Sequence, residues 1–129
     1  MIAIDTNVVV QFLTGDDPGQ SARARALIET EAVFVATTVL LETEWLLRAS
    51  YGYTHKAMES ALRAFAGLPT VTLQDAPATA QALDWMARGL DFADALHLAV
   101  AADCEAFATF DARLAKAANP LGAIPARAP

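Results

Sequence analysis

Short apolar segments alternate with longer helical segments along this chain, and this alternation restricts it to one class of fold. The apolar segments have the length of buried strands and cover residues 2–5, 33–36, 71–73 and 106–110, with a weaker one at 121–124. Strands that alternate with helices are typical of a sheet whose faces the helices cover. We therefore predict an α/β fold, a three-layer sandwich around a mostly parallel sheet of four to five strands.

Helical periodicity and capping residues place the helices between these strands. The first helix is predicted to run through Phe12 and Leu13, with Thr6 and Asn7 as its caps. Further helices are expected over residues 18–31, 37–50, 54–66, 76–88, 92–103 and 111–118, with Thr37 or Thr38 as the cap of the helix at 37–50. No linker or repeat interrupts the pattern, so we predict a single domain over residues 1–124 and a frayed tail at 125–129.

The composition excludes several classes of protein. Hydrophobic residues make up 55% of the 129 residues, and charged residues 19%, which argues against a disordered chain. The formal net charge of −6 argues against a protein that coats nucleic acid through many Lys and Arg side chains, but it is compatible with a nuclease whose metal site is acidic. The single cysteine, Cys104, excludes an internal disulfide and a cysteine metal cage.

Neither a signal-peptide pattern nor an apolar run of membrane-spanning length occurs in the sequence. We therefore expect a cytoplasmic protein that does not enter a membrane.

Four acidic residues lie where predicted strands end or where helices begin. They are Asp5, Glu42, Asp94 and Asp111. Ligands in parallel α/β sheets bind beyond the carboxyl ends of the strands, so one pocket is expected to collect all four carboxylates. Carboxylates gathered without cations repel one another, and a hard divalent cation such as Mg²⁺ or Mn²⁺ relieves this repulsion. Such a site suits the hydrolysis of phosphodiester bonds.

Each acidic residue also has a purely structural interpretation. Asp5 can act as a helix cap. Glu42 lies among apolar residues of a helix that we expect to be largely buried, where a lone carboxylate needs a partner or a metal ion. Glu44, in the same helix, is predicted to be the surface residue.

The Asp-Phe-Ala-Asp-Ala-Leu-His segment contains two aspartates one helical turn apart. Asp91 is predicted mainly as the helix N-cap and only secondarily as a metal ligand. Asp94 lies inside the first turn, where the helix dipole also favours a negative charge. His97 is expected to be a partly buried, hydrogen-bonded histidine rather than a ligand. Asp111 can cap the last helix.

Four motifs occur in a familiar order: Ile-Asp-Thr-Asn, Leu-Leu-Glu-Thr-Glu-Trp-Leu-Leu, Asp-Phe-Ala-Asp-Ala-Leu-His-Leu-Ala and Ala-Thr-Phe-Asp-Ala-Arg-Leu. Together they resemble the PIN-domain family, and in particular the VapC-type toxins of bacterial type II toxin–antitoxin systems. The resemblance implies a Mg²⁺- or Mn²⁺-dependent endoribonuclease, a homodimer and a complex with a cognate antitoxin protein. It also implies the site residues, which are the acidic residues Asp5, Glu42, Asp94 and Asp111 together with Asn7 and Thr109.

We therefore predict a toxin that hydrolyses RNA with a metal ion and without a protein nucleophile. A PIN-like binding module without catalysis is one alternative. A phosphatase of the haloacid dehalogenase type is a weaker one, because it needs an Asp at position 7, where this chain has Asn7. Part of an apolar surface is also predicted to bind a second copy or the antitoxin, the alternative being ordinary core; its residues are Trp45, Leu46, Tyr51, Tyr53, Leu62 and Phe65.

Overall fold

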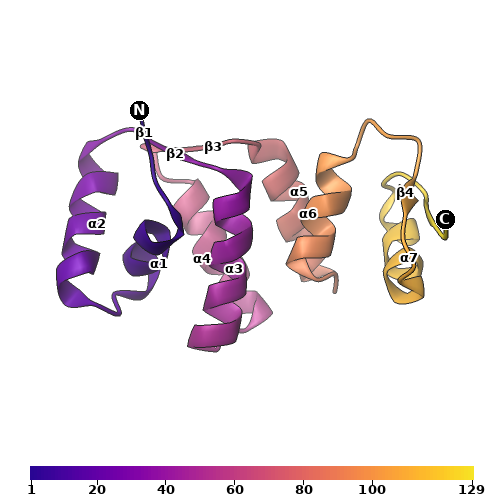
Figure 1. Ribbon diagram of the computed structural model, residues 1–129, viewed down its shortest axis with the longest axis horizontal. Coiled ribbons are helices and arrows are strands. Elements are labelled where there is room, and N and C mark those ends of the chain that lie inside the picture. The colour runs from indigo at the N-terminus through magenta and orange to yellow at the C-terminus, as the bar shows by residue number, and fades with distance from the viewer. The chain divides into compact units, whose positions relative to one another are not determined.

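The computed structural model describes residues 1–129, and the chain divides into two compact units. The N-terminal unit comprises Met1–Ala76 and the C-terminal unit Pro77–Pro129. All strand pairs are parallel, and helices account for most of both units, so the predicted α/β class is confirmed (Figure 1). The strands are grouped differently from the prediction of one sheet: three pair in the N-terminal unit and two in the C-terminal unit.

The N-terminal unit is built on a three-stranded sheet with the order β1-β2-β3. Its elements are β1 (Ile2–Ala3), α1 (Thr6–Thr14), α2 (Pro18–Thr30), β2 (Val33–Val35), α3 (Thr37–Tyr51), α4 (His55–Ala66) and β3 (Val71–Leu73). Val33 of β2 pairs with Ile2 of β1 and with Val71 of β3. Helices connect these parallel strands, as parallel pairing requires.

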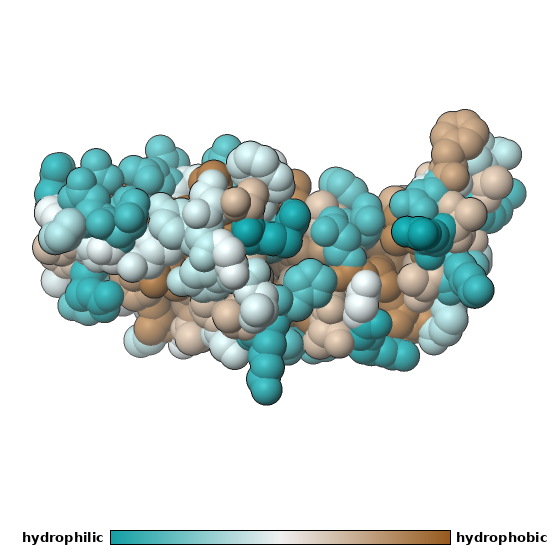
Figure 2. All heavy atoms as spheres, turned by 90° about the horizontal axis from the view of Figure 1, so that it is seen from below, coloured by the Kyte–Doolittle hydropathy of each residue, from teal (hydrophilic) through white to brown (hydrophobic).

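Apolar side chains from the strands and helices form the core of this unit. Its buried members are Ile4, Val9, Ile28, Val33, Val35, Leu40 and Phe65. The rings of Phe12 and Phe65 lie 5.8 Å apart between centroids, a usual distance for an aromatic pair. Hydrophilic side chains cover α2, at the left of Figure 2, on the side away from this core. The core fixes the ends of β1 and β2, and α1 and α3 begin directly after those ends.

Two helix starts differ in part from the prediction. Asp5 is the N-cap of α1, which confirms its structural interpretation, whereas Thr6 and Asn7 lie inside the helix; Asp5 Oδ1 accepts a hydrogen bond of 3.1 Å from the backbone N–H of Asn7. Thr37 lies inside α3, which follows Ala36 without a side-chain cap. At the other end of α3, Gly52 has a φ of 67°, the left-handed conformation in which glycine ends helices.

The C-terminal unit contains three α-helices, one 3₁₀-helix and a two-stranded parallel sheet. Its elements are α5 (Ala76–Ala87), α6 (Phe92–Val100), β4 (Phe107–Ala108), α7 (Ala112–Ala118), the 3₁₀-helix η1 (Asn119–Leu121) and β5 (Ala126–Arg127). Phe107 of β4 pairs with Ala126 of β5. The helix α6 ends three residues earlier than predicted. None of the helices of this protein is both long and apolar enough to cross a membrane.

The predictions for the end of the chain are wrong. The weak strand expected at 121–124 is absent, and the residues expected to fray form β5 instead. The side chain of Asn119 holds this segment, because its Nδ2 donates to Ala126 O at 3.0 Å and its Oδ1 accepts from Ala126 N at 2.8 Å. The Thr109 N–H also donates to Arg127 O at 2.9 Å. These hydrogen bonds to the backbone of residues 126 and 127 order a tail that has few large apolar side chains.

Candidate metal site

The first predicted carboxylate, Asp5, lies directly beyond β1. The Ile4 N–H donates to Phe34 O, so the pairing with β2 continues to the residue before Asp5. Asp5 is exposed, and one of its oxygens caps α1. Its capping role and a ligand role are compatible, because a carboxylate has two oxygens with about four acceptor positions.

Glu42 reaches the same place from α3. The hydroxyl Oγ1 of Thr6 donates a short hydrogen bond to Glu42 Oε1 and joins the starts of α1 and α3. A pocket of about 250 Å³ is lined by Asp5, Thr6, Asn7, Glu42 and Leu46. Two of the four predicted carboxylates therefore share one pocket, together with the predicted Asn7.

Thr6 is a site residue that the sequence reading missed, since it was taken only as a cap. It is 7% exposed, and its hydroxyl restricts the orientation of Glu42. Its position next to Asp5 in the Ile-Asp-Thr-Asn motif is the signal in the sequence that could have identified it.

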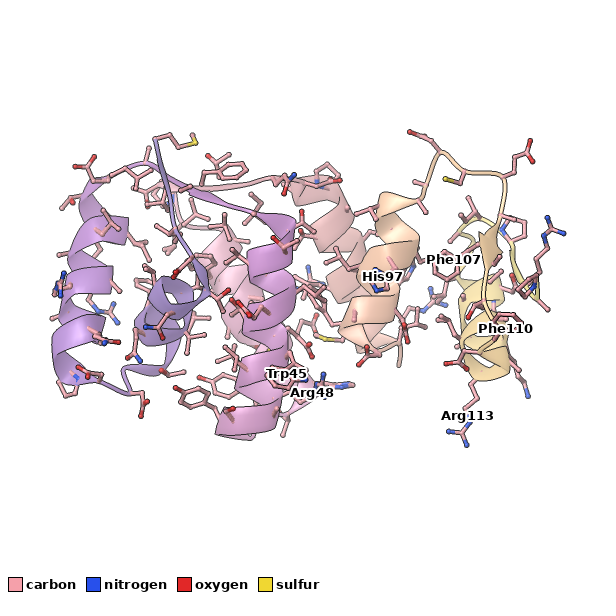
Figure 3. All side chains as sticks on the ribbon, viewed as in Figure 1. Trp45, Arg48, His97, Phe107, Phe110 and Arg113 are labelled. Carbon is pink, nitrogen blue, oxygen red and sulfur yellow. The ribbon has the colours of Figure 1, made fainter.

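The predicted environments of Glu42 and Glu44 are the reverse of those observed. Glu42 is exposed, whereas Glu44 is 2% exposed and pairs with Arg48 at 3.0 Å between Oε1 and Nε. The buried stripe of α3 consists of Leu40, Thr43, Glu44 and Leu47, at the spacing of one helix face. Trp45, labelled with Arg48 in Figure 3, is 55% exposed and lies outside this stripe.

In the C-terminal unit, Asp94 lies in the first turn of α6 and is partly buried. Burial raises the pKa of its carboxyl group above the usual value, and the negative charges of Asp91 and Asp111 raise this pKa further. The nearby His97 lowers the pKa, but its effect is the smallest. Two acidic side chains of this unit thus disfavour the charged form of Asp94.

Two structural interpretations in this segment need correction. Asp91 occupies the N-cap position of α6 as predicted, but its side chain makes no capping hydrogen bond. Its carboxylate is therefore not committed to the helix end. His97 is exposed on α6, where Figure 3 labels it, and not partly buried as expected.

Asp111 is the N-cap of α7. Its Oδ1 accepts hydrogen bonds from the N–H groups of Arg113 and Leu114, at 3.0 and 3.1 Å. The hydroxyl of Thr109 accepts from the backbone N–H of Asp111 at 3.0 Å, so it fixes the backbone of Asp111 rather than a carboxylate. The second carboxylate oxygen of Asp111 makes no capping bond.

The predicted quartet therefore falls into two sets. Asp5 and Glu42 share a pocket in the N-terminal unit, and in the C-terminal unit Asp91 and Asp111 raise the pKa of Asp94. No group of three or more His, Cys, Asp or Glu side chains converges closely enough to hold a metal ion by itself.

Comparison with known proteins places the chain in a family. The sequence model of the PIN-domain family matches residues 2–120 of this chain, a range that includes every acidic residue discussed above. The chain belongs to the PIN-domain family. The predicted family and its PIN-like α/β fold are thereby confirmed.

Among solved structures, this PIN domain is similar to a crystal structure of VapC20 from Mycobacterium tuberculosis, described as a sarcin-ricin loop cleaving toxin. The two chains share 24% sequence identity, the match covers 92% of this chain and 95% of VapC20, and the TM-score is 0.44. The comparison with curated proteins gave no match.

The donor atoms of this PIN domain suit a hard divalent cation. Asp5, Glu42, Asp94 and Asp111 offer only oxygen ligands, which Mg²⁺ and Mn²⁺ prefer. Burial and the negative charges of Asp91 and Asp111 raise the pKa of Asp94, and a nearby cation would offset these effects. PIN domains are generally nucleases that work with divalent metal ions.

Proposed function

We propose that this protein is a Mg²⁺-dependent endoribonuclease that hydrolyses phosphodiester bonds of RNA, with Mn²⁺ as an alternative ion. The observation that carries the proposal is the pocket that Asp5 and Glu42 line together, in which the Thr6 hydroxyl donates a hydrogen bond to Glu42. The family match supports it, because it extends over all four acidic residues. The further role as the toxin of a toxin–antitoxin pair is supported by the VapC-type motifs of the sequence.

In this proposal Asp5, Glu42 and Asp94 are the main metal ligands and Asp111 completes the site, with Asp91 as a secondary ligand. The family match extends over residues of both compact units, and we propose that the two units belong to one nuclease domain. A bound divalent ion would polarise the scissile phosphate and lower the pKa of the attacking water.

The chain's own residues then orient the site. Thr6 holds Glu42 in one orientation through its hydroxyl. Thr109 fixes the backbone at Asp111, and the backbone N–H of Asn7 holds one oxygen of Asp5. Such supporting hydrogen bonds to metal ligands typically contribute about 10- to 100-fold to metal affinity or activity.

The proposed activity is tested by incubating the purified protein with total cellular RNA in Mg²⁺ and in EDTA, followed by mapping of the new ends. We expect defined new ends in Mg²⁺ and intact RNA in EDTA. Cleavage that persists in EDTA would rule out the metal mechanism. RNA that stays intact in both Mg²⁺ and Mn²⁺ would instead favour a binding module without catalysis.

RNA as the substrate is supported by Phe110, labelled in Figure 3, which is 93% exposed and directly precedes Asp111 in the sequence. Exposed aromatic rings bind single-stranded RNA by stacking on its bases, which typically contributes about 1–3 kcal/mol per base. We predict that Phe110→Ala weakens RNA binding by that amount, and that Phe110→Trp retains binding. Fluorescence anisotropy with a labelled single-stranded RNA measures this. Val100→Ala, which shortens another exposed apolar side chain of the same unit, is the control, and an equal loss there would contradict the prediction.

We also propose a homodimer and an antitoxin complex. The predicted apolar surface is smaller than expected, because Leu62 and Phe65 are 2% and 1% exposed and belong to the core. Leu46, Tyr51 and Tyr53 are half-buried, whereas Trp45 is 55% exposed. Interface cores are enriched in exposed aromatic residues of this kind.

The change Trp45→Glu is expected to shift the protein from dimer to monomer at micromolar concentration, because it places a charge in the interface. Light scattering measures the mass, and Val100→Glu is the matched control at another exposed apolar side chain. A monomeric wild-type protein, with no partner that co-purifies from the native operon, would refute this part of the proposal.

A further inference from the structure

A second hollow lies beside the carboxylate pocket in the N-terminal unit. It is a groove of about 450 Å³ between α1 and α2, which Figure 1 shows side by side. Its lining residues are Asn7, Val8, Gln11, Gln20, Arg23, Ala24 and Leu27. Asn7 also lines the pocket of Asp5 and Glu42, so the groove continues from the proposed site of cleavage. Its volume is within the usual range of pockets for small ligands.

The buried side chain of Gln11 gives the groove a fixed donor. Gln11 is 7% exposed, and its Oε1 accepts a hydrogen bond of 2.9 Å from the backbone N–H of Asp17. A backbone N–H can only donate, so this bond determines which amide atom of Gln11 is the oxygen. The amide Nε2 has no partner in the protein. It is left as a pre-oriented donor for a ligand.

The other polar groups of the groove add donors as well. Arg23 is exposed at the groove and forms no salt bridge in the structure. The Nδ2 of Asn7 donates to Gln20 Oε1 at 3.2 Å, so Gln20 also presents its amide NH₂ group. Donors thus outnumber acceptors, and an acceptor-rich ligand with an apolar face fits best. Val8, Ala24 and Leu27 supply the apolar wall.

We propose that this groove binds one nucleotide of single-stranded RNA that flanks the cleaved bond. A phosphate contacts Arg23, and a carbonyl oxygen on the base edge accepts a hydrogen bond from Gln11. A nucleotide offers both a charged phosphate and such carbonyl acceptors. The inference rests on the proposed nuclease function, because continuity with the carboxylate pocket through Asn7 is what points to RNA.

The phosphate contact is tested with Arg23→Ala and its control Arg25→Ala. Both residues lie on α2 and both variants lose one positive charge, but Arg25 lies outside the groove, over the ring of Phe12 and 3.6 Å from Glu29. The probe is a fluorescently labelled RNA hexamer of random sequence, and anisotropy is measured in EDTA, where no metal-dependent cleavage occurs.

We expect Arg23→Ala to weaken binding about tenfold, as an arginine–phosphate contact typically contributes. For this variant, the slope of log affinity against log salt concentration should also be shallower by about 0.7, the change expected when one phosphate contact to a single strand is lost. Arg25→Ala should bind within about twofold of the wild type. Equal losses in the two variants, or no RNA binding by the wild type, would overturn the proposal.

The base contact is tested with Gln11→Glu. This change keeps the oxygen that accepts from Asp17 N–H but replaces the donor NH₂ group by a second acceptor, so the groove loses its donor. We expect at least about tenfold weaker RNA binding, with a melting temperature close to that of the wild type. Wild-type affinity in this variant would exclude the base contact.

These measurements separate the groove from the nuclease function. A protein that binds RNA with this dependence on Arg23 and Gln11 but never cleaves it would refute the nuclease alone. A nuclease for which Arg23→Ala and Gln11→Glu bind RNA like the wild type would refute the groove alone. If both variants bind RNA normally but lose a co-purifying antitoxin, the occupant is a protein segment, and the nucleotide proposal is wrong.

Discussion

RNA cleavage by the Asp5→Asn variant should fall by more than about 100-fold, because in the proposed site the change removes a metal ligand and not merely a supporting group. The fold should remain intact. Asn is as good an N-cap as Asp, and its Oδ1 can still accept the hydrogen bond from Asn7 N–H that begins α1. Cleavage rates with a labelled RNA in Mg²⁺ and a thermal melt of each protein measure the two effects.

Asp17→Asn is the matched control for this experiment. Asp17 is likewise exposed and is the N-cap of α2, with its Oδ1 accepting from Gln20 N–H at 3.0 Å. The control therefore loses the same charge at an equivalent helix position, and we expect wild-type cleavage. If Asp5→Asn cleaves RNA as fast as Asp17→Asn, the metal site is assigned to the wrong residues.

Mg²⁺ should stabilise the wild-type protein against heat, and Asp94→Asn should reduce this gain. In the proposed site the ion binds carboxylates of the native state and not the dispersed ones of the unfolded chain. At about 100 times its Kd it adds about 2.7 kcal/mol to the free energy of unfolding. Without metal, Asp94→Asn should melt above the wild type, because it removes a charge that burial and Asp91 disfavour.

The measurement needs thermal melts of both proteins in EDTA and in millimolar Mg²⁺. Asp103→Asn, which neutralises an exposed aspartate of the same unit, is the control, and its melting temperatures in EDTA and in Mg²⁺ should match those of the wild type. A wild-type melting temperature that Mg²⁺ leaves unchanged, together with a less stable Asp94→Asn, would mean that the carboxylates are helix-end residues and not a site.

The higher melting temperature that we expect for Asp94→Asn without metal should depend on pH. The pKa of Asp94 is raised above its usual value of 3.8, so the unfolded chain releases this proton before the folded protein does. The stability that Asp94 contributes is fully present below pH 3.8 and is lost as the pH rises through the raised pKa. In EDTA, the melting temperature of the variant should therefore exceed that of the wild type at pH 7, and the difference should disappear as the pH falls towards 3.8.

The sequence was sufficient to predict most of the elements, because their signals are local. The strands at 33–35 and 71–73 are short apolar segments, and Pro18 and Gly52 mark a helix start and a helix end as their backbone preferences require. The positions of Asp5 and Asp111 after strands were equally readable. Each depends only on neighbouring residues.

The errors arose where distant residues decide the outcome. Glu44 is buried because its helix face packs inward and Arg48 compensates its charge, and apolar spacing around Trp45 did not reveal which face that is. The tail is ordered because Asn119 and β4 supply its hydrogen bonds.

The sequence by itself therefore determined the α/β class, the family motifs and the acidic residues. Local propensity and chain order specify these features. Only the tertiary structure decided that Thr6 holds Glu42, a pair 36 residues apart, and that Gln11 faces a groove with a free donor. Hydrogen bonds between distant residues depend on how helices pack, and that packing follows from the summed contacts of the whole core rather than from any one segment.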